Sequence, residues 1–152
     1  MPQIESSIVI QAPRAAVMAV ARDNEKFPEF MADLQSIQVQ EKSADGSRVV
    51  SEWVGIVPKF GAKIRWVEED VWDEAAGTCT FRQLSGDYKR WEGVWTFAPE
   101  GENATRFSSL VDYEIEIPLV GPLIKTIIRK AVQDNVDATL RAIKERCESA
   151  AG

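Results

Sequence analysis

The sequence predicts an α+β domain in which a curved antiparallel sheet of about seven strands wraps around one long helix near the C-terminus. Two patterns carry this prediction. Apolar residues recur with helical spacing from Pro118 to Cys147, and between residues 37 and 117 the apolar period is two. A helix of about 25 residues with one apolar stripe also needs a broad apolar surface, which a twisted sheet supplies.

The N-terminal part predicts one strand followed by two short helices. Residues 3–10 alternate in polarity, as a strand does. Pro13 suits the first turn of a helix over residues 14–22, and Asp23-Asn24 can cap a second helix. The apolar side of this second helix consists of Phe27, Phe30, Met31 and Leu34.

Six further strands follow, joined by turns of hairpin length. They cover residues 37–40, 48–57, 62–73, 78–84, 88–97 and 105–117. Such turns predict antiparallel pairing, with the first strand beside the last or a middle strand. Gly55 and Gly93 suit bends or bulges. In the strand 62–73 the apolar signal is mixed and does not identify the inward face.

The long helix carries two polar residues within its apolar stripe. At roughly 100° per residue, Asn135 and Thr139 fall among Ile128, Val132 and Val136. Asn135 either bonds to a neighbouring backbone group or a trapped water, or this part of the stripe faces a cavity.

Length and composition limit the function classes. The 152 residues predict a single domain over residues 1–148, with residues 149–152 as a frayed tail. A net charge of −6 argues against nucleic-acid binding, and the absence of His removes His-based catalysis and the commonest zinc ligand. We expect no cofactor and no metal.

Cysteine usage and hydropathy indicate the compartment. Cys79 and Cys147 lie far apart without CxxC spacing, so two free, buried thiols are expected. No apolar run reaches the length of a membrane span, and no signal-peptide pattern opens the chain. We therefore expect a cytoplasmic protein without stable membrane insertion.

Large aromatic side chains are concentrated in the predicted strands. Each one alone is typical of a core residue, but together they suit the walls of a pocket for an apolar ligand. Polar residues in phase with the apolar faces could orient such a ligand: Ser51, Gln83, Ser109, Tyr113, Asn135 and Thr139. The candidate ligand-binding residues are Trp53, Phe60, Trp66, Phe81, Trp91, Trp95, Tyr113, Ile128, Val132 and Asn135.

An acidic triplet, Glu68-Glu69-Asp70, is the one candidate for acid/base chemistry. Two of its three side chains must share a strand face. A solvated strand edge is the plain interpretation, and a carboxyl with a raised pKa acting as general base is the alternative. Arg65 and Arg90 could pair an anionic ligand group or neighbouring Glu residues.

Several segments, in this order, resemble the START-like superfamily of helix-grip proteins, in particular its polyketide cyclase/dehydrase and coenzyme-Q-binding branch. The segments are Ala12-Pro13 with Val17, Phe27-Pro28-Glu29-Phe30, the strand Trp91–Phe97 with Gly93, Trp95 and Phe97 in a Gly-x-Trp-x-Phe pattern, and the approach from Tyr113 to Pro122. The resemblance covers essentially the whole chain. It implies a cavity between sheet and helix that binds a lipid, quinone, polyketide or other apolar molecule.

Three functions follow as hypotheses. The first is a carrier or sensor of an apolar small molecule, with ligand entry near Phe60 and residues 27–31. The second is a cyclase or dehydrase, for which Arg65, Tyr113 and one of Glu68 or Asp70 are the catalytic candidates. The third is a protein-interaction module similar to the ribosome-association toxin, so a protein partner stays open.

Overall fold

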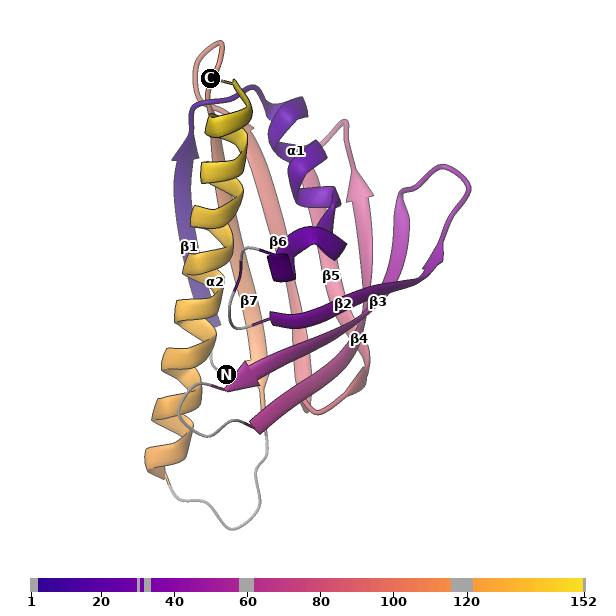
Figure 1. Cartoon of the computed structure of the whole chain (residues 1–152), viewed down its shortest axis with the longest axis vertical. Coiled ribbons are helices and arrows are strands. Elements are labelled where there is room, and N and C mark those ends of the chain that lie inside the picture. Colours follow the sequence, from indigo (N-terminus) through magenta and orange to yellow (C-terminus); the bar gives the residue numbers. More distant parts are fainter. Residues whose placement is uncertain (1–2, 30, 32–33, 58–61, 116–121, 152) are drawn as a thin grey trace.

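The computed structural model describes residues 3–29, 31, 34–57, 62–115 and 122–151, and it confirms the α+β architecture (Figure 1). Strand β1 (Gln3–Ile10) precedes helix α1 (Arg14–Arg22) and a 3-10 helix, η1 (Asn24–Glu29). The other strands are β2 (Leu34–Lys42), β3 (Arg48–Val57), β4 (Ala62–Asp73), β5 (Thr78–Gly86), β6 (Arg90–Pro99) and β7 (Thr105–Glu114). Helix α2 (Pro122–Ala151) follows.

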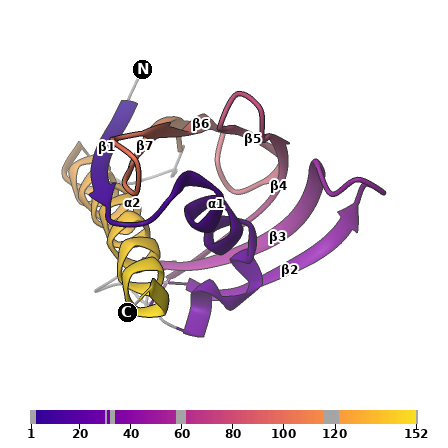
Figure 2. The ribbon, with the colours of Figure 1, turned by 90° about the horizontal axis from the view of Figure 1, so that it is seen from above.

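All seven strands form one antiparallel sheet in the order β1-β7-β6-β5-β4-β3-β2. Strand β1 therefore occupies the edge beside the last strand, which was one of the two expected places. Figure 2 shows the sheet curving round, with α2 along its open side and α1 over one end. The concave face of the sheet and the apolar side of α2 thus enclose the interior.

The second short helix is shorter than the sequence predicted. It forms a 3-10 helix that ends at Glu29, with Pro28 inside it. Proline lacks a backbone N–H and does not support a continuing α-helix. Leu34, which we assigned to that helix, instead begins β2 and is buried. Phe30 lies outside the described residues.

The ends of the last strand and the last helix also differ from expectation. The described part of helix α2 begins at Pro122, which suits a first helical position, and residues 118–121 lie outside the described residues. It continues through Ala151, so residues 149–151, which we expected to fray, are helical. The described part of β7 ends at Glu114, and residues 116 and 117 lie outside the described ranges.

Helix α2 is anchored along β1 by polar contacts. The Ser6 hydroxyl donates to an Asp137 carboxylate oxygen at 2.6 Å, and the Lys144 ammonium donates to the carbonyl of Val9 at 2.9 Å. These contacts hold one flank of α2 against the sheet edge, so its apolar side lies over the concave face.

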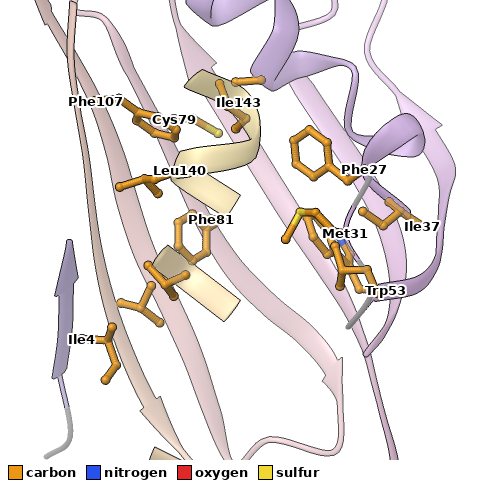
Figure 3. Packing of buried hydrophobic residues seen from close by; sticks show 14 of the residues in the cluster. Ile4, Phe27, Met31, Ile37, Trp53, Cys79, Phe81, Phe107, Leu140 and Ile143 are labelled. Atoms are coloured by element: carbon orange, nitrogen blue, oxygen red, sulfur yellow. The ribbon is translucent and has the colours of Figure 1, made fainter. Parts of the chain in front are cut away.

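The core is one cluster of buried hydrophobic residues, part of which Figure 3 shows from close by. Beneath the C-terminal half of α2, Leu140 and Ile143 face Phe107 and Cys79 from the sheet. Near η1, the same cluster includes Phe27, Met31, Ile37 and Trp53. Cys79 and Cys147 are free and buried, as predicted.

Of the two strand glycines, Gly55 lies at an irregularity of the strand pairing, whereas the pairing through Gly93 is regular. The pairing of β2 with β3 shifts register between Leu34 and Ser36, directly opposite Gly55. At Gly93 a Cβ atom would lie 2.2 Å from the carbonyl oxygen of Leu110 and 2.7 Å from the Phe81 ring. The absence of a side chain at Gly93 therefore allows the Phe81 ring to lie over the backbone of β6.

Candidate ligand cavity

The inward face of strand β4 carries both tryptophan and carboxyl side chains. Trp66, Glu68, Asp70 and Trp72 are all buried, whereas Val71 on the opposite face is 42% exposed. This answers the question that the mixed apolar pattern left open. The tryptophans determine the direction of the face, because they can bury far more apolar area than the valines of the other face.

A bulge in β5 lies beside this face. Val67 pairs with Ser85 and Glu68 pairs with Gln83, so Leu84 is an extra residue without a partner in β4. Leu84 is accordingly 44% exposed. Beyond the bulge, Gly86 packs so closely on Trp66 that a Cβ atom would lie 2.5 Å from the Trp66 Cα.

The inner faces of β3 to β7 form a continuous aromatic wall. Trp53 stacks on Trp66 with ring centroids 5.7 Å apart, and Trp66 lies 5.5 Å from Trp91. Tyr88 stacks on Trp91 at 4.7 Å, and Phe81 lies 6.2 Å from Trp91. Rings at these separations attract one another through dispersion and quadrupole interactions.

Between this wall and α2 lie two small cavities, each of about 50 Å³. The lower cavity lies beside the N-terminal half of α2. Its lining consists of Leu34, Gly55, Ile56, Ile64, Trp66, Tyr88, Trp91, Ile128, Ala131, Val132 and Asn135. Each cavity has room for a few water molecules.

The upper cavity lies beside the middle of α2. Its lining consists of Trp53, Trp66, Glu68, Phe81, Trp91, Trp95, Ser109, Val111, Asn135, Val136, Thr139 and Leu140. Trp66, Trp91 and Asn135 line both cavities. These three side chains therefore form the partition between two parts of one interior space.

The structure brings most of the predicted ligand-binding residues to these cavities. Trp53, Trp66, Phe81, Trp91, Trp95, Ile128, Val132 and Asn135 line one or both. Tyr113 is buried and pairs with Trp91 across β6 and β7, but does not line either cavity. Phe60 lies outside the described residues.

The acidic triplet is divided between the two faces of the sheet. Glu69 points outward and accepts hydrogen bonds from Arg48 at 2.6 Å and Arg82 at 3.0 Å. These hydrogen bonds lower the pKa of Glu69, and the one from Arg48 has the largest effect. Glu68 and Asp70 are each only 5% exposed, so the interpretation as a solvated strand edge is wrong for these two carboxyls.

Glu68 and Asp70 form a buried carboxyl pair. The Trp66 indole N–H donates to Glu68 Oε1 at 2.8 Å. Burial raises the pKa of Asp70 well above its ordinary value, and repulsion from Glu68 together with a hydrogen bond between the two carboxyls raises it further. The surroundings of Asp70 therefore favour its protonated form more than water does.

The other catalytic candidates lie elsewhere. Arg65 is exposed, on the outer face of β4, so it cannot act in the interior as the enzyme hypothesis required. Burial raises the pKa of Tyr113, and the nearby Arg129 opposes part of that shift through its charge and a hydrogen bond. Of the four candidates, Glu68 is the one that lines a cavity.

Three of the polar side chains proposed to orient a ligand are already engaged. The Ser51 hydroxyl accepts a hydrogen bond from the Trp53 indole at 2.9 Å. The Thr139 hydroxyl donates to the backbone carbonyl of Asn135 at 2.8 Å. Gln83 binds the backbone N–H and C=O of Tyr88. By contrast, Ser109 Oγ and Trp91 Nε1 are buried without a hydrogen-bond partner in the part of the chain that the structure describes.

Sequence reasoning missed Tyr88 as a cavity residue. Tyr88 follows a turn and precedes β6, so strand alternation does not predict its direction. Its position depends on two hydrogen bonds between its backbone and the Gln83 side chain. The Gln83 amide donates to the Tyr88 carbonyl at 2.8 Å, and the Tyr88 N–H donates to Gln83 Oε1 at 3.2 Å. The only available signal was the single aromatic residue in the charged segment Asp87–Arg90.

A larger hollow of about 490 Å³ lies on the outer face of the sheet, around Gly93. Charged side chains from four strands surround it, among them Glu69, Arg82, Glu92 and Asp112. It is an open groove on the outer face, whereas the aromatic cavities lie inside the fold.

Among the described residues, no group of three or more Cys, Asp or Glu side chains could hold a metal. None of the described helices combines the length and the apolar composition that a membrane span requires.

Comparisons with known proteins agree with this architecture. A family model described as "Polyketide cyclase / dehydrase and lipid transport" matches residues 10–140. The crystal structure of TTHA0849 from Thermus thermophilus is 34% identical, with a TM-score of 0.90 over 99% of this chain and 100% of that one.

Two further relatives are more distant. The ribosome association toxin RatA of Pseudomonas aeruginosa is 24% identical over 142 residues, 93% of this chain and 95% of that protein. The ZhuI aromatase/cyclase from Streptomyces sp. R1128 has a TM-score of 0.89 at 17% identity, over 99% of this chain and 96% of that one. At this identity, the likeness to ZhuI concerns the fold.

Proposed function

Because this chain belongs to the polyketide cyclase/dehydrase and lipid transport family, we propose that it binds an apolar small molecule between its sheet and α2, as a carrier or sensor. The observation that carries the proposal is the aromatic interior itself. Five tryptophans are present, and four of them line cavities between β3–β7 and α2. Apolar walls with a few polar groups are typical of small-molecule sites.

The size of the cavities indicates how binding would proceed. Each measures about 50 Å³, far below the roughly 300–1,000 Å³ of a site for a drug-sized ligand. Movement of Trp66, Trp91 or Asn135 would join the two cavities into one. A ligand would thus occupy a space that it opens, with α2 held on its β1 flank by Ser6–Asp137 and Lys144–Val9.

A fluorescence titration tests this proposal. Nile red is neutral and planar, and its emission rises and shifts to the blue in apolar surroundings. We expect saturable one-to-one binding to the wild type. In Ala131→Phe, a larger side chain would fill the lower cavity, so we expect affinity to fall at least about tenfold, equivalent to about 1.4 kcal/mol.

The matched control is Arg141→Phe, which adds the same ring at an exposed position of α2. It should bind Nile red as the wild type does. Absence of saturable binding to the wild type, or equal binding by Ala131→Phe and the wild type, would count against an interior site.

Catalysis is a second candidate, favoured by the Glu68–Asp70 pair. Glu68, which lines the upper cavity, could remove a proton from the carbon next to the one that carries a hydroxyl group and transfer that proton to the departing hydroxyl, which yields a double bond and water. A β-hydroxyketone such as 4-hydroxy-4-phenyl-2-butanone is a suitable probe, followed by absorbance of the conjugated product. Loss of turnover in Glu68→Gln, with Glu69→Gln unaffected, is expected if this role is real.

The similarity to RatA favours a third candidate, binding to the ribosome. The net charge of −6 weighs against direct contact with RNA, which requires cationic patches. Sedimentation of the protein with ribosomal subunits from its own host distinguishes this candidate, because a carrier would remain at the top of the gradient.

A further inference from the structure

The upper cavity has two buried carboxyl groups at its wall without a cation beside them. Glu68 lines this cavity, and Asp70 lies behind it. The ion pairs found among the described residues involve neither carboxyl, and the nearby Arg22 pairs with Glu74 while its guanidinium lies over the Trp72 ring. Among the described residues, the hydrogen bond that the structure shows to this pair comes from the Trp66 indole N–H, which donates to Glu68.

The same cavity also contains polar atoms that lack a partner. Ser109 is 1% exposed, lines the cavity, and its Oγ has no hydrogen-bond partner within the described ranges. Trp91 also lines the cavity. Its indole N–H is buried and has no hydrogen-bond partner among the described residues. Unsatisfied buried polar atoms cost free energy, so they indicate a guest with polar groups of its own.

We propose that the upper cavity selects an apolar ligand bearing a neutral hydroxyl group, which donates a hydrogen bond to Glu68, and that it excludes carboxylate ligands. This inference rests on the proposed function, because it assigns the ligand class of the same interior. The proposed selectivity favours phenols and alcohols over fatty acids, whereas a purely apolar cavity would bind both classes equally.

The physical reason is the combination of charge and hydrogen-bonding capacity. A carboxylate offers about four acceptor sites, and the Trp66 indole N–H occupies one of those on Glu68. A ligand hydroxyl can use a remaining acceptor site without bringing charge into the interior. A ligand carboxylate would bring a further carboxyl group into a desolvated space that already contains two, with no cation beside them to pair it.

Three probes with one ring system test the inference: naphthalene, 2-naphthol and 2-naphthoate at neutral pH. Binding is followed by the NMR signals of the five tryptophan indole N–H groups, with those of Trp66 and Trp91 assigned through Trp→Phe variants. We expect 2-naphthol to bind about tenfold more tightly than naphthalene, and 2-naphthoate at least about tenfold more weakly.

Two matched variants separate charge in the cavity from charge on the protein. Glu68→Gln keeps an acceptor for Trp66 but replaces one carboxyl of the pair with a neutral amide, so discrimination between naphthalene and 2-naphthoate should fall about tenfold. Glu69→Gln removes the same charge from the outer face and should leave the order of the three probes as in the wild type.

The outcomes distinguish this inference from the proposed function. Failure of all three probes to shift any indole signal would contradict interior binding itself. Binding of naphthalene together with equal affinity for 2-naphthol and 2-naphthoate would leave the proposed function intact and overturn the hydroxyl assignment. The wild-type comparison alone decides between these outcomes, even if Glu68→Gln fails to fold.

Discussion

Glu68 and Asp70 are the residues in which this interior departs most from an ordinary hydrophobic core. Buried carboxyls are expensive unless they are paired and hydrogen-bonded. Here Trp66 donates one hydrogen bond to Glu68, and Asp70 Oδ1 has no partner among the described residues. A pair retained at such a cost is more typical of a functional site than of a stabilising one.

The raised pKa of Asp70 gives a prediction with a definite sign. The pKa of Asp70 is raised in the folded state, whereas in the unfolded chain Asp70 has its ordinary pKa of about 3.9. Folding therefore takes up a proton, and the stability of the wild type falls as pH rises toward the folded pKa. Asp70→Asn removes this dependence, so its stability relative to wild type should rise by up to about 1.4 kcal/mol per pH unit.

Urea unfolding at about pH 5 and about pH 8 measures this difference. The other ionisable or charged groups that influence this site are Glu68, Glu69, the Cys79 thiol, Arg22 and the Tyr88 hydroxyl. Glu69→Gln is the control, because a lowered pKa changes stability only in acid. An equal pH dependence in the wild type and Asp70→Asn would mean that Asp70 is ionised in the folded protein.

At the level of elements, Gly93 connects the curvature of β6 with the aromatic wall. A Cβ atom there would collide with the Leu110 carbonyl oxygen at 2.2 Å and the Phe81 ring at 2.7 Å. We expect Gly93→Ala to lower the free energy of unfolding by about 3 kcal/mol, since neither β7 nor the ring can move away without loss of packing.

Gly101→Ala is the matched control for this substitution. Gly101 has a φ of +84° with no neighbouring atom within 4 Å, so alanine there should cost only the conformational strain, about 1 kcal/mol. Urea unfolding compares the two variants. If Gly93→Ala were no less stable than Gly101→Ala, the close approach at β6 would not be a real constraint.

The elements themselves were largely predictable from local patterns. Alternation and hairpin turns predicted all seven strands, and the apolar stripe predicted the long helix. The inward face of β4 was not predictable, because Trp66 and Trp72 share it with two carboxyls, Glu68 and Asp70, while valines lie on the opposite face. The bulge at Leu84 likewise depends on the register between strands.

In the candidate site, too, local patterns predicted some of the residues, and others depend on contacts between strands. Strand phase brought Trp53, Trp66, Phe81, Trp91 and Trp95 to one side of the sheet, as the sequence indicated. The direction of Tyr88 could not be predicted, because a side chain of the neighbouring strand holds its backbone. The burial of two carboxyls contradicts the usual preference of acidic residues, and no local pattern signals it.

At the scale of the whole molecule, the fold holds α2 firmly on one flank and leaves the other flank over the aromatic interior. The hydrogen bonds to Ser6 and Val9 join α2 to β1 at one edge of the sheet. The other edge, β2, lies at the far end of the strand order. Enlargement of the interior would then come from the sheet side around β3 and β4.

The most direct test of an apolar guest inside this fold is native mass spectrometry, on the protein as purified and after incubation with a total lipid extract. We expect a one-to-one mass excess that disappears on denaturation and is reduced in Ala131→Phe, with the released molecule extractable into organic solvent. A single unliganded mass under both conditions would contradict the binding of an apolar ligand in the interior.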